Sequence, residues 1–332
     1  AVPTEPFLAD QVEVLRGPAT LIYGSGSIGG VVNMVTNTIP REMPEDGVSA
    51  RALIQGDSAA GQRFAAGRID LGSGNFAFHA NAFYRRSDDY EIPGPAELYP
   101  DHDEDHDDHD EEHEEHGEEA GGVLENSFLD NEGGAIGASW IGDRWTAGLS
   151  YTAYDSDYGI PGAHAHEHEE EGHAGEDEHL DEDEYEEEEI LVNVGLENRR
   201  IDGLLLGRDP FRGFNQLKLN LTSTDYTHTE FEGDEVGTVF DSESTDSRVE
   251  LRHNPWGAWE GVFGGQYTDR EFSATGAEAF VPPSETRTFG LFWVESLERD
   301  NWLFDLGLRF EDVSLEALQL CLLYTSPSPR DL

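Results

Sequence analysis

The sequence predicts an all-β protein whose main part is a partial transmembrane antiparallel β-barrel, and three observations lead to this fold class. After residue 47, apolar and polar residues alternate with a period of two, as they do in half-buried strands. In residues 301–310, for example, Trp302, Phe304 and Leu306 occupy every second position. The connections between such segments alternate between short and long, and five of the six tryptophans flank the short ones.

This pattern predicts eleven strands, and their connections divide by length. The strands are expected at 48–57, 62–72, 75–88, 127–141, 144–156, 190–200, 213–229, 244–254, 258–272, 285–298 and 301–313. The long connections are 89–126, 157–189, 230–243 and 273–284. In a meander, alternate connections lie on opposite sides, so the long ones share one side. Only 201–212 is longer than a tight turn on the other side. Outer-membrane barrels have this asymmetry.

The tryptophans agree with a membrane barrel. An aromatic girdle at one bilayer interface is expected where they flank the short turns, at Trp140, Trp145, Trp256, Trp259 and Trp302. The alternative is a large soluble β-sandwich, which would not need so many long strands in up-and-down order. An open sheet edge in lipid leaves backbone groups unpaired, so we expect the natural barrel to continue beyond these strands.

The composition restricts the partners. The chain has 20 Lys and Arg against 71 Asp and Glu, for a net charge of −51, which argues against nucleic acid and fits cations. A single cysteine, Cys321, excludes a disulfide framework. The sequence contains no run of 18 apolar residues, so no transmembrane helix is predicted. We find no G-x-S-x-G element or other catalytic constellation, so no enzyme and no catalytic cofactor are expected.

Both ends of the sequence lead us to expect a fragment. The chain opens without a signal peptide. The segment Cys321–Leu332 breaks the preceding pattern and resembles translated sequencing-adapter read-through, so we predict a non-native tail at 317–332; the alternative is a genuine Pro/Ser-rich tail.

A glycine-rich segment precedes the predicted strands. Residues 24–29 match G-x-G-x-x-G, which would bind a dinucleotide if a helix followed. Residues 31–36 instead read Val-Val-Asn-Met-Val-Thr, which is typical of a strand. We therefore expect these glycines to serve tight turns.

The segment Val12–Thr36 resembles the end of the plug domain of TonB-dependent outer-membrane receptors, through its Val-Glu-Val-Leu-Arg-Gly-Pro run, its Tyr23-Gly24 turn and the strand at 31–36. The resemblance implies a 22-stranded barrel closed by a plug, in the outer membrane of a Gram-negative bacterium. It implies that 1–44 is the C-terminal part of the plug and 45–316 the N-terminal half of the barrel. It also implies a TonB–ExbB–ExbD partner that acts through a missing N-terminal region.

Two acidic tracts lie in the first two long connections. Residues 101–119 hold 13 acids and five histidines, and residues 164–189 hold 15 acids and five histidines. The candidate metal ligands are His102, His106, His109, His113, His116, His164, His166, His168, His173 and His179. The first five are spaced by 4, 3, 4 and 3, which would align them on one helix face if a bound cation relieved the charge repulsion. The second five favour an extended or irregular ligand set.

Imidazole and carboxylate without thiolate suit Zn²⁺, with Cu²⁺ and Ni²⁺ as competitors. Two other motifs fit poorly. His109–His113 has Asp110 where a zincin helix has Glu, and Asp101–Glu112 has His106 where an EF-hand loop needs Gly. Acids alone would suit disordered, solvated loops, but solubility does not require ten histidines.

Several segments, among them 85–94 and 154–170, also resemble zinc-uptake receptors of the ZnuD-like subgroup. This resemblance implies that the transported ligand is zinc or a similar divalent metal. His79, predicted to face the lumen, and His228, near a loop, are candidate relay residues, although each is expected to be an ordinary lumen or rim residue. The alternatives are a receptor for a siderophore, haem or another chelate, and a soluble metal-buffering β-protein.

Overall fold

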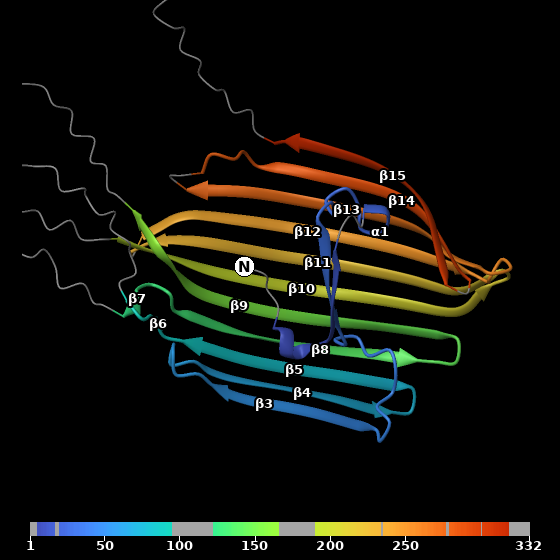
Figure 1. The fold of residues 1–332 in the computed structure, drawn as a ribbon, viewed down its shortest axis with the longest axis horizontal. Helices are drawn as coiled ribbons and strands as arrows, with labels where there is room; N and C mark the ends of the chain where they lie inside the picture. The colour runs from blue at the N-terminus through green and yellow to red at the C-terminus, as the bar shows by residue number, and fades with distance from the viewer. Residues whose placement is uncertain are drawn as a thin grey trace, which may run out of the picture.

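The computed structural model describes residues 5–16, 20–94, 122–165, 190–233, 235–276, 279–299 and 301–318. Its main feature is an 11-stranded antiparallel sheet in the order β15-β14-β13-β12-β11-β10-β9-β8-β5-β4-β3 (Figure 1). Strands that neighbour in the sheet are also consecutive in the meander, apart from a two-stranded excursion between β5 and β8. The predicted fold class is therefore confirmed.

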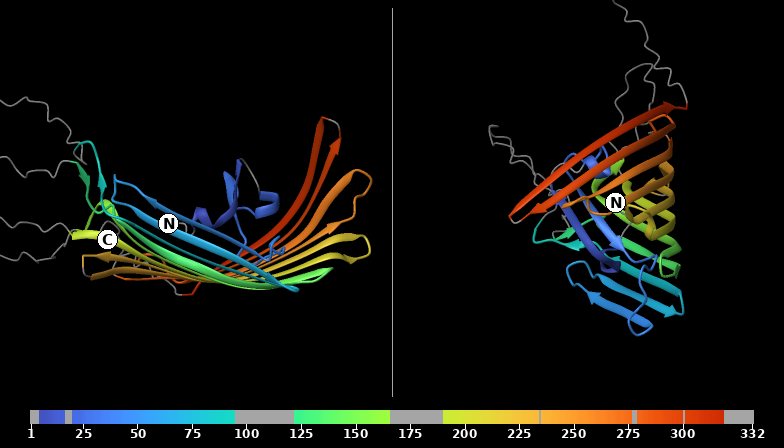
Figure 2. Two further views of the ribbon diagram at one scale, coloured as in Figure 1. Left: turned by 90° about the horizontal axis from the view of Figure 1, so that it is seen from below. Right: turned by 90° about the vertical axis from the view of Figure 1, so that its right-hand side faces the viewer.

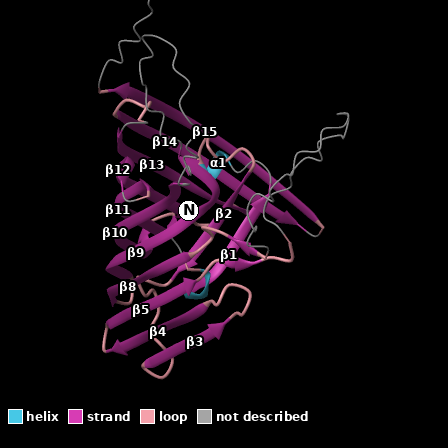
Figure 3. Ribbon diagram, turned by 90° about the vertical axis from the view of Figure 1, so that its left-hand side faces the viewer, coloured by secondary structure: helices cyan, strands magenta, loops and turns pink. Residues whose placement is uncertain are grey.

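The strands lengthen toward the middle of the sheet. Their bounds are β3 Val48–Gly56, β4 Arg63–Ser73, β5 Phe76–Ser87, β8 Leu129–Ile141, β9 Trp145–Ala165, β10 Ile190–Phe211, β11 Phe214–Glu232, β12 Glu235–His253, β13 Trp259–Gly276, β14 Ser284–Arg299 and β15 Trp302–Ala317. The excursion is the small hairpin of β6 Tyr90–Glu91 and β7 Val123–Leu124. Figure 3 shows how little of the described chain is anything other than strand.

All eleven predicted strands exist, but two predicted connections do not. The segment 201–212 was expected to link two strands, yet β10 continues to Phe211 and a tight turn follows. The run Leu204-Leu205-Leu206 removes the apolar/polar alternation, because Leu204 packs inward and Leu205 faces outward, so both faces are apolar there. The long connection 230–243 is also wrong, since β11 reaches Glu232 and β12 begins at Glu235. This segment mixes acidic residues with Phe231, Val236, Val239 and Phe240, which do not alternate with a period of two, so no strand pattern is visible.

The bounds of the two tract-bearing connections differ from the prediction, and only the second connection is shorter. Within 89–126, the ends form β6 and β7. Within 157–189, the first residues extend β9 as far as Ala165. At the other end of the chain, β15 takes in Ala317, the first residue of the predicted tail, and 319–332 lie outside the described residues.

The N-terminal segment lies against the concave side of the curved sheet (Figure 2). It consists of the 3-10 helix η1 Pro6–Leu8, the antiparallel pair β1 Ala9–Arg16 and β2 Gly30–Thr36, and the single helical turn α1 Thr20–Tyr23. The strand β2 follows the glycine-rich segment directly, so the dinucleotide alternative is excluded. Leu8 packs with Phe64, Phe83, Tyr154 and Leu196 of the sheet, which forms the core between the two parts.

The convex face changes character along each strand. On β11, Leu217, Leu219 and Leu221 face outward, and Ser223 and Asp225 follow on the same face. On the neighbouring strands, the outward positions opposite Asp225 are also charged, with Arg199 on β10 and Glu243 on β12. This apolar band covers roughly the first ten residues from the short turns, about the length a strand needs to cross a bilayer. The remaining loop-side halves lie beyond the band.

The tryptophans bound this band on the short-turn side. Trp140 ends β8, Trp145 begins β9, and Trp259 and Trp302 begin β13 and β15. Trp256 lies in the turn between β12 and β13 and is 56% exposed. This is the predicted girdle position. No helix among the described residues is long and apolar enough to cross a membrane.

Candidate functional site

The candidate site is the loop-side rim, by which we mean residues 87–94, 122–131, 154–165, 190–198 and 226–240 at the ends of β5 and β8–β12. Both His/acid tracts leave the sheet from this rim, the first between β5 and β8 and the second between β9 and β10. Strands β8 and β9 are direct neighbours, so the two connections emerge side by side. The described ends of both tract-bearing connections therefore lie at the same end of the sheet, as predicted.

The candidate histidines themselves fall almost entirely beyond what the structure describes. His164 belongs to β9, where its backbone pairs with Leu191 of β10. The predicted one-faced helix lies outside the described residues. So do the other nine histidines, which are His102, His106, His109, His113, His116, His166, His168, His173 and His179. Within the described ranges, no group of three or more His, Cys, Asp or Glu side chains could hold a metal ion.

Asn126 joins the bases of the two tracts. Its backbone has a positive φ of 56°, and the residue is 4% exposed. The side-chain amide donates to the carbonyl of Ile160 at 3.2 Å and to that of Val192 at 2.8 Å. These carbonyls belong to β9 and β10, the strands that bound the second tract, while Asn126 itself follows the first. Sequence reasoning missed this residue, since a lone Asn has no period, although Asn tolerates positive φ well.

Gly159 permits this close approach. A Cβ at that position would lie 2.2 Å from the side-chain oxygen of Asn126 and 2.3 Å from its backbone oxygen. The Gly159 amide also donates to the carbonyl of Phe128 at 3.2 Å. Ser127 completes the base, because its amide donates to Asp89 at 2.8 Å and its hydroxyl accepts from the Tyr90 amide at 2.8 Å.

The two Tyr-x-Ile-Pro-Gly repeats were predicted to be equivalent exits, and they are only similar. Both lie at the rim, but the first leaves the main sheet after Ser87 and forms β6. The second remains in β9, where Tyr158 pairs with Val194 and Gly162 takes a φ of 71°. The repeats therefore mark the same level of two hairpins with different backbone paths.

The outward side of the rim is strongly acidic. Asp157 has a raised pKa, because it is partly desolvated and because Asp130 and Asp155 repel its negative charge. Two arginines border these acids: Arg199 lies 2.7 Å from Asp155 and 3.4 Å from Glu197, and Arg86 lies 3.8 Å from Asp130. Such a field attracts cations from solution.

His228 lies on the inward side of the same rim, as the fifteenth residue of β11. Its Nδ1 is 3.3 Å from the Tyr226 hydroxyl, and its Nε2 is 3.5 Å from a carboxylate oxygen of Glu230. Nε2 is buried and has no hydrogen-bond partner among the described residues. The ring meets Phe240 edge-on, at 5.4 Å between centroids. Burial lowers the pKa of His228, which favours the neutral imidazole.

His79, the other inward-facing histidine considered from sequence, is fully occupied. Its Nδ1 lies 2.7 Å from Asp70, and its Nε2 lies 2.7 Å from the Asn81 amide. Asp70 in turn pairs with Arg68 at 3.0 Å, and Arg68 contacts Asp10 of β1. His79 therefore belongs to a charge network that fastens the N-terminal segment to the sheet, and it has no nitrogen free for a metal.

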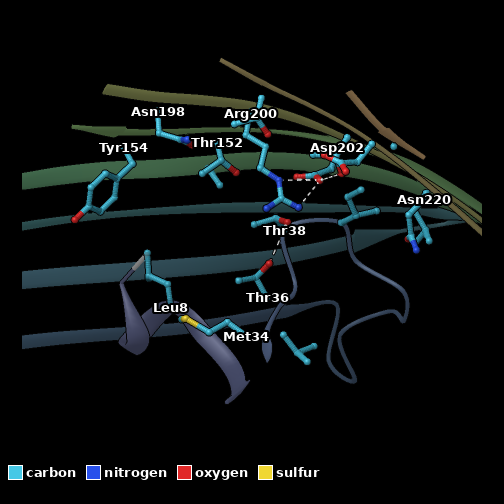
Figure 4. Close-up of a pocket in the computed structure, with 18 of the residues that line it drawn as sticks. Leu8, Met34, Thr36, Thr38, Thr152, Tyr154, Asn198, Arg200, Asp202 and Asn220 are labelled. Atoms are coloured by element: carbon cyan, nitrogen blue, oxygen red, sulfur yellow. Dashed lines mark hydrogen bonds and ion pairs between the residues drawn. The ribbon is translucent and has the colours of Figure 1, made fainter. Parts of the chain in front are cut away.

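A cavity of about 770 Å³ separates β2 from the wall (Figure 4). Met34, Thr36 and Thr38 line it from the N-terminal segment, and Tyr154 and Arg200 line it from the sheet. Arg200 is held against Asp202 at 2.6 Å. The N-terminal segment crosses the concave side here, so this space lies inward of the rim.

Comparisons with known proteins agree with this architecture. Residues 2–31 match the TonB-dependent Receptor Plug Domain. The hemin receptor of Yersinia pestis is 33% identical over 84 residues, which cover 25% of this chain and 11% of that protein. The probable TonB-dependent siderophore receptor PirA of Acinetobacter baumannii is 51% identical over 41 residues, 12% of this chain and 5% of the relative.

Solved structures share the fold at low sequence identity. The copper transporter OprC superposes with a TM-score of 0.67 at 12% identity, over 96% of this chain and 44% of that one. The FrpB iron transporter from Neisseria meningitidis superposes with a TM-score of 0.63 at 10% identity, over 93% of this chain and 47% of that one. The chain thus spans less than half the length of these structures and a smaller part of the curated relatives.

Together, the plug match, the relatives and the fold support a TonB-dependent receptor, and they place the chain in the outer membrane. The alternative of a soluble metal-buffering β-protein is therefore wrong. A soluble protein would not expose the apolar band of the convex face to water, and in this band Leu221 is 49% and Leu308 66% exposed.

Proposed function

We propose that this chain belongs to a TonB-dependent receptor that imports zinc or a similar divalent metal, which the two His/acid tracts capture at the cell surface. The tracts contain ten of the thirteen histidines of the chain, interleaved with 28 carboxylates. Neutral imidazole together with carboxylate, without thiolate, suits Zn²⁺ first and Cu²⁺ or Ni²⁺ next. The metal is the cargo of this receptor and not a resident cofactor.

One observation supports this proposal above the others: both tracts are rooted at one base. Asn126 reaches from the end of the first connection to both strands that bound the second. Ligands from both tracts can therefore serve the same incoming ions. The acids around Asp157 add a negative field at this base, which favours capture of cations from dilute solution.

The relatives do not identify the transported ligand of this chain. Their names refer to hemin, a siderophore, copper and iron, so the specificity of this chain must follow from its own residues. In the proposed cycle, the TonB–ExbB–ExbD complex of the inner membrane supplies the energy by pulling on the plug. Metal then passes inward without any chemical conversion, so no catalytic residue is needed.

A second candidate is a receptor for a siderophore, haem or another metal chelate. It is favoured by the two curated relatives, a hemin receptor and a probable siderophore receptor. In that case the tracts would be a cation-rich surface near the entry of a chelate.

Uptake of labelled zinc separates the two candidates. Cells that carry the receptor gene, intact or with all ten tract histidines changed to Ala, are compared at limiting metal. We expect the substituted receptor to lose most zinc uptake. Changing the ten histidines to Asn is the matched control for side-chain volume and should have the same effect. Unchanged zinc uptake in both variants would contradict capture by the tracts, and simultaneous uptake of a ferric siderophore or haem would favour the second candidate.

A further inference from the structure

A pair of side chains below the tracts has the geometry of a half-built metal site. His228 and Glu230 are two residues apart on β11 and therefore project from the same, inward face. Their nearest atoms, Nε2 and a carboxylate oxygen, are 3.5 Å apart. That distance is too long for a good hydrogen bond, and Nε2 has no other partner among the described residues.

The separation matches what one zinc ion would impose. Nitrogen and oxygen ligands lie about 2.0–2.2 Å from Zn²⁺, and at tetrahedral angles two such ligands are about 3.3–3.5 Å apart. A metal ion between Nε2 and the carboxylate would therefore require little movement of either side chain. It would also give a partner to a buried nitrogen that has none among the described residues, which is a cost in the empty site.

The other ring nitrogen is already oriented. Nδ1 lies 3.3 Å from the Tyr226 hydroxyl, and Phe240 packs edge-on against the ring. Metal-binding histidines commonly donate their second N–H to a neighbouring group, which fixes the tautomer and the ring plane. Here Tyr226 would accept from Nδ1, so that Nε2 presents its lone pair toward Glu230.

We propose that His228 and Glu230 form an open two-residue site that accepts Zn²⁺ from the tracts and passes it inward. This inference rests on the proposed function, because it assumes a divalent metal as cargo. With two protein ligands, the other coordination positions stay free for water or for a donor arriving with the metal. A site of this kind binds more weakly than a closed four-ligand site and can release its ion.

The position of the pair suits a transfer step. It faces the concave side at the level where the second tract leaves the sheet, since Glu230 pairs with Val194 of β10 and Val194 pairs with Tyr158 of β9. The cavity between β2 and the wall lies further toward the short turns on the same face, where Asn198 and Thr224 line it. A metal ion at His228 would therefore sit at the inward side of the rim, on the loop side of this cavity.

Zinc binding to the purified outer-membrane protein tests the pair. The background variant has all ten tract histidines changed to Ala, and zinc chloride is titrated into it by calorimetry. We expect one remaining zinc ion per chain. His228→Ala in this background should abolish that binding. Tyr226→Phe should leave the stoichiometry unchanged and weaken affinity by about 10- to 100-fold, as loss of an orienting hydrogen bond does elsewhere.

The matched control is His79→Asn, which removes the inward-facing histidine whose two ring nitrogens are both occupied. It should leave zinc affinity unchanged. A background variant that binds no zinc, or one that still binds after His228→Ala, overturns the site. The intact protein separates this failure from failure of the proposed function: equal stoichiometry in intact and background protein refutes capture by the tracts, while the remaining ion supports the His228 site.

Discussion

Two histidine–glutamate pairs lie at opposite ends and on opposite faces of the sheet, and they differ in what is left free. At the loop-side rim, His228 and Glu230 face inward, 3.5 Å apart, with Nε2 unpartnered among the described groups. At the short-turn end, His253 and Glu295 face outward, 2.9 Å apart. There, Nδ1 of His253 also lies 2.7 Å from the Asn254 carbonyl, so both ring nitrogens are occupied.

Packing explains why the histidine ring of the second pair is closed, although Oε2 of Glu295 has no hydrogen-bond partner among the described residues. His253 on β12 and Glu295 on β14 meet above Gly261 of the intervening β13, where a Cβ would lie 2.4 Å from the Glu295 carboxyl carbon. The Trp293 indole donates to the same carboxylate oxygen at 2.7 Å, and Trp256 stacks on the His253 ring at 4.0 Å. His253 is 1% and Glu295 4% exposed. The same two residue types therefore form a structural clamp here and an open ligand pair at the rim.

Breaking the clamp should have the largest effect on stability. Glu295→Ala leaves His253 and the Trp293 N–H buried without their shared acceptor, and loss of one partner of a buried pair costs about 3–5 kcal/mol. Urea unfolding of the folded barrel in detergent measures this loss. Glu298→Ala, an exposed position on the same strand, is the control and should stay within about 0.5 kcal/mol. A loss below about 1 kcal/mol for Glu295→Ala would show that the clamp contributes little.

The same measurement sharpens the contrast between the pairs. His228→Ala removes a ring whose Nε2 has no partner among the described residues, so its effect on unfolding should be clearly smaller than that of Glu295→Ala. Its effect on zinc binding should be the larger one. A His228→Ala variant that unfolds as easily as Glu295→Ala would indicate that the rim pair is structural as well.

A second contrast concerns what surrounds the convex face, which is lipid along the apolar band and water beyond it. Leu221 and Thr227 both point outward from β11, six residues apart, with Leu221 inside the apolar band and Thr227 beyond it. An Arg on the lipid-facing side costs about 2–4 kcal/mol near the bilayer midplane and about 0–1 near or beyond the interface. Leu221, which lies between the middle of the band and its loop-side limit, should have an intermediate cost, so Leu221→Arg should destabilise the barrel in lipid vesicles more than Thr227→Arg. Equal losses would contradict the proposed limit of the band near Ser223.

The sequence could predict the parts of the fold that depend on repetition. The alternation in β15 and in residues 145–153 follows directly from one lipid-facing and one inward face, so all eleven strands were found. Around the turn between β11 and β12, apolar and acidic residues follow one another without alternating, as in Val239-Phe240-Asp241. The period therefore vanishes there, and the connection predicted at 230–243 is wrong. Leu204 interrupts the period for the opposite reason, because its inward-facing position is apolar and buried.

The site was less predictable, since it depends on contacts between distant residues. Composition located the tracts, and strand parity assigned them to one side. Nothing in the local sequence distinguishes Asn126 from other loop asparagines, because its role depends on carbonyls 34 and 66 residues away. Likewise, His79 and His228 look alike as inward-facing histidines, and only the partners of their ring nitrogens separate them.

The smallest expected effect concerns the base of the tracts. Gly159→Ala would place a Cβ 2.2 Å from the Asn126 side-chain oxygen, so β8 or β9 must shift at the rim. Overpacking of this kind costs about 1–3 kcal/mol, and the shift should also weaken zinc capture, since it separates the two bases. Unfolding in urea and zinc titration measure the two effects.

Gly94→Ala is the matched control for Gly159→Ala, because Gly94 closes the other Tyr-x-Ile-Pro-Gly repeat and a Cβ there meets no atom of the described residues within 4 Å. It should change neither stability nor zinc capture measurably. If Gly159→Ala lowers stability while zinc capture is unchanged, the Asn126 contact fastens the rim but does not couple the tracts. If both variants behave like the unmodified protein, the rim tolerates the added methyl group, and the loop-side end is much less tightly packed than the clamp at the short turns.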